Sequence, residues 1–304
     1  ADSIAANSHL SYPAYENTAL LVAQLRSLGI KHLRDGFHTS VTNQAIPNYD
    51  PDSVLYARWK ALGELGIRFN VVVDPNEYLT LNNAPLTAAV LNHLTMEACM
   101  LVESLEGANE MDNGTPVGWN GACVQWQQGL YAAVKSMAQV WQPNYLPCLG
   151  PSLADPSRGP DIGNLSHWLD LGSIHCYAGG NKPNVIFPSC LQFASVVSGT
   201  KPLMATECGY HNDVSVYGGI SEVASGKYIP RMFLLNFLNG IVRSYIYELL
   251  DDSSQTGAEA SFGLIRADGS VKPAFFAVKN MLSILSRENV ALSPLNFTLG
   301  GPGV

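Results

Sequence analysis

Two glutamates that end hydrophobic, strand-like runs are the residues of this chain best placed to do chemistry. Glu110 ends Met-Leu-Val-Glu-Ser-Leu-Glu-Gly-Ala-Asn-Glu (100–110), and Glu207 ends Lys-Pro-Leu-Met-Ala-Thr-Glu (201–207). Loop-forming residues follow both, which is where a barrel of parallel strands presents its chemical groups. Because a pair of carboxyl groups across one cleft suffices to cleave a glycosidic bond, the two positions predict a carboxylate-based site.

Alternating strand and helix patterns must hold this pair in place. Helical periods end at glycines, as in 19–28 before Gly29 and 52–65 before Gly66, and each leads into a β-rich run. This alternation predicts an α/β fold with a single (β/α)8 TIM barrel. Further helices are predicted at 126–140 and 273–285, and the strands at 8–12, 31–34, 68–73, 100–105, 145–149, 173–177, 203–206 and 242–247.

The length of 304 residues fits one barrel. We expect the catalytic barrel to span 1–287, and a tail at 288–304 to pack on it or to lead toward a further segment. The Pro- and Gly-rich stretches 150–163 and 179–188 directly follow predicted strands, so they are interpreted as loops at the active-site face and not as linkers.

Composition excludes several classes of protein. A net charge of −8 with only 17 Lys and Arg argues against nucleic-acid binding. Apolar runs such as 67–73 are far shorter than the roughly 20 residues that span a bilayer, so no transmembrane segment is expected. We expect a monomer that is secreted or periplasmic, with its signal peptide not present in this chain, which starts at Ala1.

Six cysteines occur without a Cys-x-x-Cys pair, so a structural zinc site is not expected. Their even number permits disulfides. Cys176 and Cys208 lie at strand positions and are interpreted as buried free thiols.

Three motifs carry a resemblance to a known group of enzymes. Gly-Ala-Asn-Glu (107–110), His-Cys-Tyr (175–177) and Ala-Thr-Glu (205–207), at the ends of the fourth, sixth and seventh strands, resemble clan A glycoside hydrolases, with family 39 the nearest. Members of that clan are retaining (β/α)8 enzymes. The resemblance implies that Glu110 is the acid/base, and that Glu207 is the nucleophile.

The resemblance also implies supporting residues. Asn109 would bond the sugar 2-hydroxyl, Arg34 would hold the nucleophile ionised, and Tyr177 would contact it. His175 would point inward with Tyr177, since residues i and i+2 share a strand face. The alternatives are a surface ion pair between Arg34 and Asp35, and core roles for the histidine and tyrosine.

The eighth strand departs from the clan pattern, because Tyr247-Glu248 stands where many members have a tryptophan. Tyr247 would stack on the sugar. Glu248 would accept hydrogen bonds from hydroxyls or, as a third carboxylate, raise the pKa of Glu110.

Asn76 and Trp119 are weaker candidates for substrate binding, together with Asp74 and His211. Each also suits an ordinary loop position. Glu106 precedes the Asn-Glu pair and is expected to form a structural hydrogen bond.

The sequence therefore predicts a retaining O-glycoside hydrolase that cleaves an oligo- or polysaccharide by double displacement, with no cofactor and no metal. A carbohydrate-binding barrel without activity is the alternative. A metal-dependent barrel hydrolase is less favoured, because Ser-His-Leu-Ser (8–11) lacks a His-x-His pair. No lysine lies within a predicted strand core, which disfavours a Schiff-base aldolase.

Overall fold

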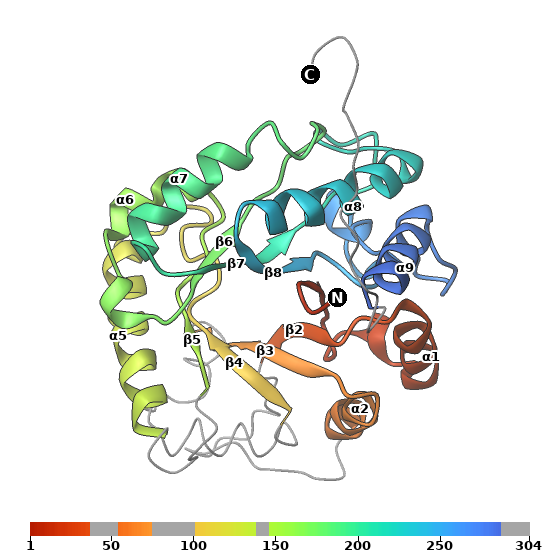
Figure 1. Cartoon of the computed structure of the whole chain (residues 1–304), viewed down its shortest axis with the longest axis horizontal. Coiled ribbons are helices and arrows are strands. Elements are labelled where there is room, and N and C mark those ends of the chain that lie inside the picture. Colours follow the sequence, from red (N-terminus) through yellow and green to blue (C-terminus); the bar gives the residue numbers. More distant parts are fainter. Residues whose placement is uncertain (37–53, 75–100, 138–145, 287–304) are drawn as a thin grey trace, which may run out of the picture.

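Short runs rich in apolar residues form eight parallel strands, in a computed structural model that describes residues 1–36, 54–74, 101–137 and 146–286 (Figure 1). Strands buried on both faces have few polar residues, as in the segment 4–7. The strands are β1 (Ile4–Asn7), β2 (His32–Gly36), β3 (Arg68–Val72), β4 (Val102–Glu106), β5 (Cys148–Leu149), β6 (Gly172–His175), β7 (Leu203–Cys208) and β8 (Ile241–Ile246).

The strands close into a barrel. Their order is β5-β4-β3-β2-β1-β8-β7-β6, so the first strand pairs with both the second and the eighth. A parallel bridge between Leu149 and Leu171, next to β6, joins the two ends of the sheet. The predicted (β/α)8 barrel is confirmed, and the carboxyl ends of all eight strands share one face.

Helices surround the ring of strands (Figure 1). In α1, Leu21, Leu25 and Leu28 are buried, each contributing about 1.5–3 kcal/mol. Asn17 caps its first turn, and Gly29 ends it with a φ of 89°. The described helices are α1 (Thr18–Leu28), α2 (Val54–Gly63), α5 (Trp119–Met137), α6 (Gly159–Ile162), α7 (Phe187–Ser198), α8 (Glu222–Leu238) and α9 (Pro273–Leu285), with the short 3₁₀ helices η1 (Pro13–Tyr15), η2 (Pro156–Arg158), η3 (Ser166–Trp168) and η4 (Gly257–Ala260).

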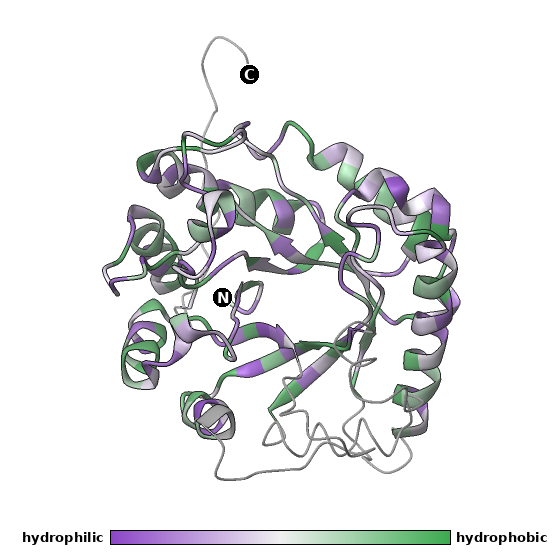
Figure 2. Ribbon diagram, turned by 180° about the vertical axis from the view of Figure 1, so that it is seen from behind, coloured by the Kyte–Doolittle hydropathy of each residue, from purple (hydrophilic) through white to green (hydrophobic). Residues whose placement is uncertain are grey.

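Polar side chains occupy part of the barrel interior. Figure 2 shows hydrophilic residues on the strands beside hydrophobic ones. Glu106 is fully buried and accepts bonds from Arg34 and Asn70, and Ser104 donates to Asn70 over 2.7 Å. A buried charge is tolerated only when it is paired in this way. The expected structural hydrogen bond of Glu106 is confirmed.

The first strand differs from its prediction. It runs over Ile4–Asn7 and not over 8–12, because small apolar residues pair with both neighbours while the chain turns afterwards. Tyr12 N donates to His9 O in that turn, and Pro13 then begins η1. Helix α5 also begins earlier than predicted, at Trp119.

One cysteine prediction is wrong. Cys176 forms a disulfide with Cys190 of α7, because the loop after β6 brings the two residues together across 14 positions. Cys208 is a buried free thiol, as predicted. The tail at 288–304 lies outside the described residues. Within the described part of the chain, no helix combines the length and apolar character needed to cross a membrane.

Candidate active site

Arg34 of β2 organises the carboxyl ends of four strands. It makes five hydrogen bonds, which matches the five N–H donors of a guanidinium. Nε and Nη2 hold Glu106, Nη1 donates to Asn7 and to Glu207 Oε1, and Nη2 also donates to Asn109 Oδ1. Burial lowers the pKa of Arg34, but Glu106 and Glu207 have the larger combined effect and raise it above its usual value. The alternative surface pair with Asp35 is wrong, since Asp35 accepts bonds from the loop after β1.

Glu207 is held on both oxygens. Oε1 lies 2.7 Å from Arg34 Nη1, and Oε2 accepts a 2.7 Å bond from the hydroxyl of Tyr177. Burial and the charge of Glu207 raise the pKa of Tyr177 well above 10, so this hydroxyl remains a donor. The two donors therefore fix the orientation of the Glu207 carboxylate.

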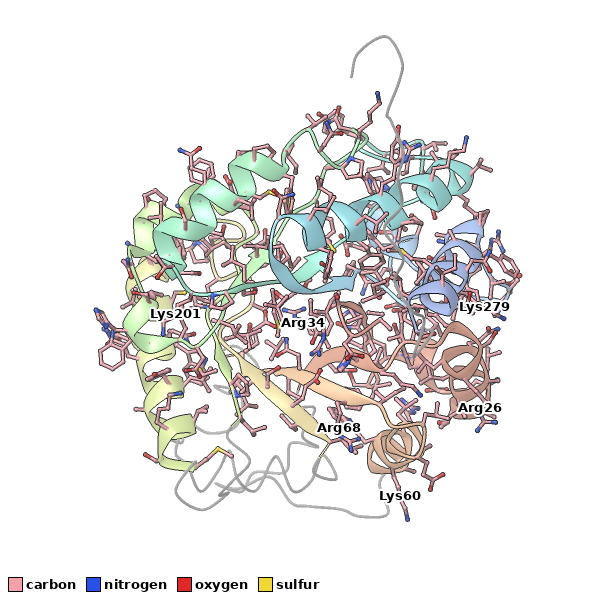
Figure 3. All side chains as sticks on the ribbon, in the orientation of Figure 1. Arg26, Arg34, Lys60, Arg68, Lys201 and Lys279 are labelled. Atoms are coloured by element: carbon pink, nitrogen blue, oxygen red, sulfur yellow. A yellow bond between two sulfur atoms is a disulfide. The ribbon has the colours of Figure 1, made fainter. Side chains whose placement is uncertain are left out.

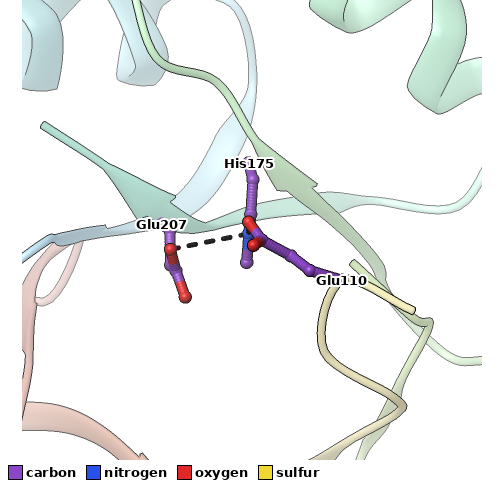
Figure 4. A group of neighbouring side chains, drawn as sticks. All are labelled: Glu110, His175 and Glu207. Atoms are coloured by element: carbon purple, nitrogen blue, oxygen red, sulfur yellow. Dashed lines mark hydrogen bonds and ion pairs between the residues drawn. The ribbon is translucent and has the colours of Figure 1, made fainter. Parts of the chain in front are cut away.

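His175 joins the two glutamates (Figure 4). Its Nδ1 lies 2.6 Å from Glu110 Oε1 and 3.6 Å from Glu207 Oε2. One carboxylate oxygen of Glu110 and one of Glu207 lie within 4.8 Å of each other. Retaining glycosidases hold their carboxyl groups about 5–5.5 Å apart, whereas inverting enzymes need roughly 6.5–9.5 Å. The close spacing matches the retaining arrangement.

Glu110 and His175 shift each other's pKa. Burial raises the pKa of Glu110, but the hydrogen bond and charge of His175, with Arg34, lower it overall. Burial lowers the pKa of His175, but Glu207 and Glu110 raise it overall. The opposite directions of the two pKa shifts favour an ion pair, with the proton on His175 and the charge on Glu110.

The backbone before Glu110 is tightly constrained. A Cβ on Gly107 would stand 2.1 Å from Gln127 Oε1 and 3.0 Å from Pro151 N, so only glycine fits there. Glu110 itself has a φ of 48°, a left-handed conformation that costs about 1–3 kcal/mol in a non-glycine residue and occurs preferentially at functional sites. Asn109 is fixed through Asp74, which accepts its backbone N–H at 3.0 Å.

Both glutamates open into one cavity of about 420 Å³, within the usual size range of ligand sites. Some of its lining was not predicted. His9 and Tyr12 were assigned to the first strand, but they lie in the turn that follows it. The lining residues are His9, Tyr12, Asn109, Glu110, Tyr177, Gly179, Glu207, Gly209, Tyr210, His211, Gly218, Tyr247, Glu259 and Phe262.

Tyr247 and Glu248 are consecutive residues, but only Tyr247 lies in the cavity. Tyr247 lines the cavity, and its ring meets Tyr177 and Phe262 edge-on. Glu248 does not line it: the carboxyl is buried, 3.5 Å from His9 Nε2. Burial and the nearby Asp251 and other acidic groups raise the pKa of Glu248 to about 9.

The hypothesis that Glu248 raises the pKa of Glu110 is wrong. The Glu110 pKa is lowered, and its acidic neighbour with an opposing effect is Asp112. A carboxyl that is neutral at pH 7 exerts little charge repulsion.

The weaker candidates have different outcomes. Trp119 does not line the cavity, because it packs with Leu153 and Ile162 in a separate cluster and its ring lies 4.8 Å from the Arg158 guanidinium. Asn76 lies outside the described residues. His211 does line the cavity.

Glu110, His175 and Glu207 are also the described residues that could hold a metal ion, with ligand atoms within 4.8 Å of one another. Both oxygens of Glu207 already accept hydrogen bonds, one of them from the Arg34 guanidinium. A metal cation bound to Glu207 would be repelled by the positive charge of Arg34. The donor set therefore fits two carboxylate catalysts better than a metal centre.

Comparison with solved structures identifies the fold. The chain resembles a family 39 glycoside hydrolase from Bacteroides cellulosilyticus WH2, with a TM-score of 0.69 and 18% identity over 93% of this chain and 64% of the other. It resembles the GH39 enzyme of Xanthomonas axonopodis pv. citri, with a TM-score of 0.66 and 17% identity over 92% and 66%. The chain thus spans less than two thirds of the length of both.

A further similar structure is the glycoside hydrolase family 17 β-1,3-glucanosyltransferase of Rhizomucor miehei, with a TM-score of 0.60 and 16% identity over 89% of this chain and 96% of the other. No sequence-family model matches the chain, and no curated protein matches it. The fold expected from the three motifs is confirmed: this chain has the same (β/α)8 barrel fold as these solved glycoside hydrolases.

Proposed function

We propose that the protein is a retaining glycoside hydrolase acting on an oligo- or polysaccharide. One observation carries the proposal: Glu110 and Glu207 line the same cavity, with oxygens within 4.8 Å, in contrasting environments. Glu207 is bonded by a cation and a hydroxyl, whereas Glu110 shares a proton with His175. Two carboxyl groups with divided roles are what double displacement requires.

In the first step, a Glu207 oxygen attacks the anomeric carbon while Glu110 takes up the proton held by His175 Nδ1 and gives it to the glycosidic oxygen, which leaves with the bonding electron pair. A covalent glycosyl-enzyme forms. In the second step, Glu110 removes a proton from water and restores it to the pair with His175, the water oxygen attacks the same carbon, and Glu207 leaves as a carboxylate. The sugar keeps its anomeric configuration, and both glutamates return to their starting states.

Residues around the pair position the sugar. Arg34 fixes the amide oxygen of Asn109, so the amide N–H donors are the part of Asn109 that can reach a sugar hydroxyl in the cavity. Tyr247 supplies an aromatic face where many barrel glycosidases have a tryptophan.

Substitution of each glutamate tests the proposal. Glu207→Gln should reduce turnover of every glycoside to background. Glu110→Gln should lose about 10²–10⁴-fold on substrates with poor leaving groups and much less on dinitrophenyl glycosides, whose departure needs no proton. Azide should restore activity more readily in Glu110→Gln.

Glu64→Gln, in the turn before β3, removes the same charge far from the cavity and should retain activity. Wild-type turnover in both active-site variants would defeat the proposal. Binding of glycans without any product over a broad panel would support a carbohydrate-binding barrel instead.

We also propose that the protein is secreted or periplasmic and acts as a monomer. The Cys176–Cys190 disulfide supports an oxidising compartment, since such bonds are rare in the cytosol. A monomer suffices for the proposed mechanism, because all of its groups lie in one chain. Fractionation of the source cells and sedimentation analysis would test the two statements.

A further inference from the structure

The cavity has an unusual charge distribution, because carboxylates line it while the cationic partners of two of them, Arg34 for Glu207 and His175 for Glu110, do not. Glu110, Glu207 and Glu259 line it, whereas no Lys or Arg does so among the described residues. Arg34 lies at the centre of the ring of strands (Figure 3). Its five donors are already bonded to Glu106, Asn7, Glu207 and Asn109. Other cations labelled in Figure 3, such as Arg26 and Lys279, lie outside the ring.

The remaining sequence offers little to neutralise these carboxylates. Outside the described residues, segments 37–53, 75–100 and 138–145 contain no Lys or Arg, and segment 287–304 contains one, Arg287. Lys182 follows the cavity residue Gly179 by three positions, but it is exposed and does not line the cavity. Lys272 is buried, and its Nζ donates hydrogen bonds to Asp251 and to the Ser261 carbonyl.

Glu259 is the carboxylate that the proposed reaction leaves unused. It lies on η4, in the connection between β8 and α9, and its side chain is accessible to solvent. Tyr247 donates to its Oε2 at 3.3 Å, and Oε1 accepts no bond from the described residues. Partial burial raises the pKa of Glu259, and the charges of Glu207 and Glu110 raise it further, although the hydrogen bond from Tyr247 lowers it. The three carboxylates are therefore close enough to influence one another.

The segment that carries Glu259 is anchored. The Ser261 hydroxyl accepts the backbone N–H groups of Asn212 and Asp213, and its carbonyl accepts Lys272 Nζ at 3.0 Å. Lys272 also bonds Asp251 at 2.7 Å. The carboxylate is therefore presented from a fixed position, as a specificity-determining group must be.

We propose that Glu259 restricts the sugar beside the catalytic pair to uncharged glycosides, by accepting hydrogen bonds from hydroxyls and repelling the carboxylate of a uronic acid. The inference rests on the proposed glycosidase function and names its substrate class. An ionised carboxylate only accepts hydrogen bonds, so it suits the hydroxyl donors of a neutral sugar. The carboxylate of a uronic acid would instead be repelled by Glu259, and no Arg or Lys of the described cavity lining could pair with it.

The test compares matched pairs of 4-nitrophenyl glycosides that differ only at C6: glucoside with glucuronide, and galactoside with galacturonide, as monosaccharides and as disaccharides. The wild type should favour the uncharged member by kcat/KM. Glu259→Gln should raise the ratio of uronide to neutral kcat/KM about tenfold, and Glu259→Lys should raise it further. Glu64→Gln is the matched control and should leave the ratio unchanged.

Two results would overturn the inference while leaving the glycosidase proposal intact. One is a wild type that cleaves a uronide at least as well as its neutral partner. The other is an unchanged ratio in both Glu259 variants. Failure of the wild type on every glycoside would instead defeat the proposed function itself, and this inference with it.

Discussion

His175 Nδ1 lies 2.6 Å from the carboxylate of Glu110 and 3.6 Å from that of Glu207. One imidazole therefore contacts both groups of the proposed mechanism. Its pKa is raised, because the two carboxylates outweigh the effect of burial, while that of Glu110 is lowered. In the free enzyme the acid/base proton thus belongs to a pair and not to Glu110 alone.

The pH profile should report this pair. The proton is retained until the pH rises through the raised pKa of His175, which sets the alkaline limb of kcat/KM. In His175→Gln, Glu110 must hold the proton itself, and its pKa rises from its lowered value but remains that of a partly buried carboxyl group. The alkaline limb should therefore move to lower pH, which pH-dependent kcat/KM measures.

His167→Gln, an exposed histidine on η3, is the matched control and should keep the wild-type profile. An unchanged alkaline limb in His175→Gln would show that Glu110 holds its proton independently.

Arg34→Lys should reduce activity more than it reduces stability. Lysine keeps the charge but has three donors instead of five, so it cannot bond Glu106, Glu207 and Asn109 together. Loss of one charge-assisted bond costs about 1.5–3 kcal/mol, which corresponds to roughly a 10- to 100-fold fall in kcat/KM. Steady-state kinetics and thermal unfolding measure the two effects. Arg26→Lys on the exposed face of α1 should change neither, and full activity in Arg34→Lys would contradict the role of the five bonds.

The Cys176–Cys190 disulfide should stabilise the site as well as the fold. Cys176 stands between His175 and Tyr177, and Cys190 lies on α7. Cys190→Ser should lower the free energy of unfolding by about 2–4 kcal/mol and reduce kcat/KM, because Tyr177 loses its anchor. Chemical denaturation and kinetics measure both. A reductant should reproduce these effects in the wild type and have no further effect on Cys190→Ser; a wild type indifferent to reduction would refute the claim.

Lys272→Met should destabilise the protein by about 3–5 kcal/mol, because it leaves Asp251 charged and buried without its cation. Lys272 is 1% exposed and lies 2.7 Å from Asp251 Oδ1. Urea denaturation measures the loss. Adding Asp251→Asn should recover part of it, whereas Lys279→Met on the surface should cost less than about 0.5 kcal/mol. A double variant as unstable as Lys272→Met would rule out the uncompensated charge as the cause.

The sequence by itself determined the barrel and the position of its principal groups. Local patterns suffice for this: an apolar run followed by loop residues places Glu110, Glu207 and Arg34 at one face, because all parallel strands end there. The His-x-Tyr spacing of His175 and Tyr177 also indicated a shared direction, and both do reach Glu207.

Only the tertiary structure decided which distant residues complete the site. His9 and Glu259 come from opposite ends of the chain and line one cavity, and Cys176 pairs with Cys190 and not with a strand neighbour. Glu248 follows the cavity residue Tyr247, but its carboxyl group is buried beside His9 and does not line the cavity. Such outcomes depend on how the barrel closes and how its loops fold back, and these long-range contacts leave no periodic trace in the sequence.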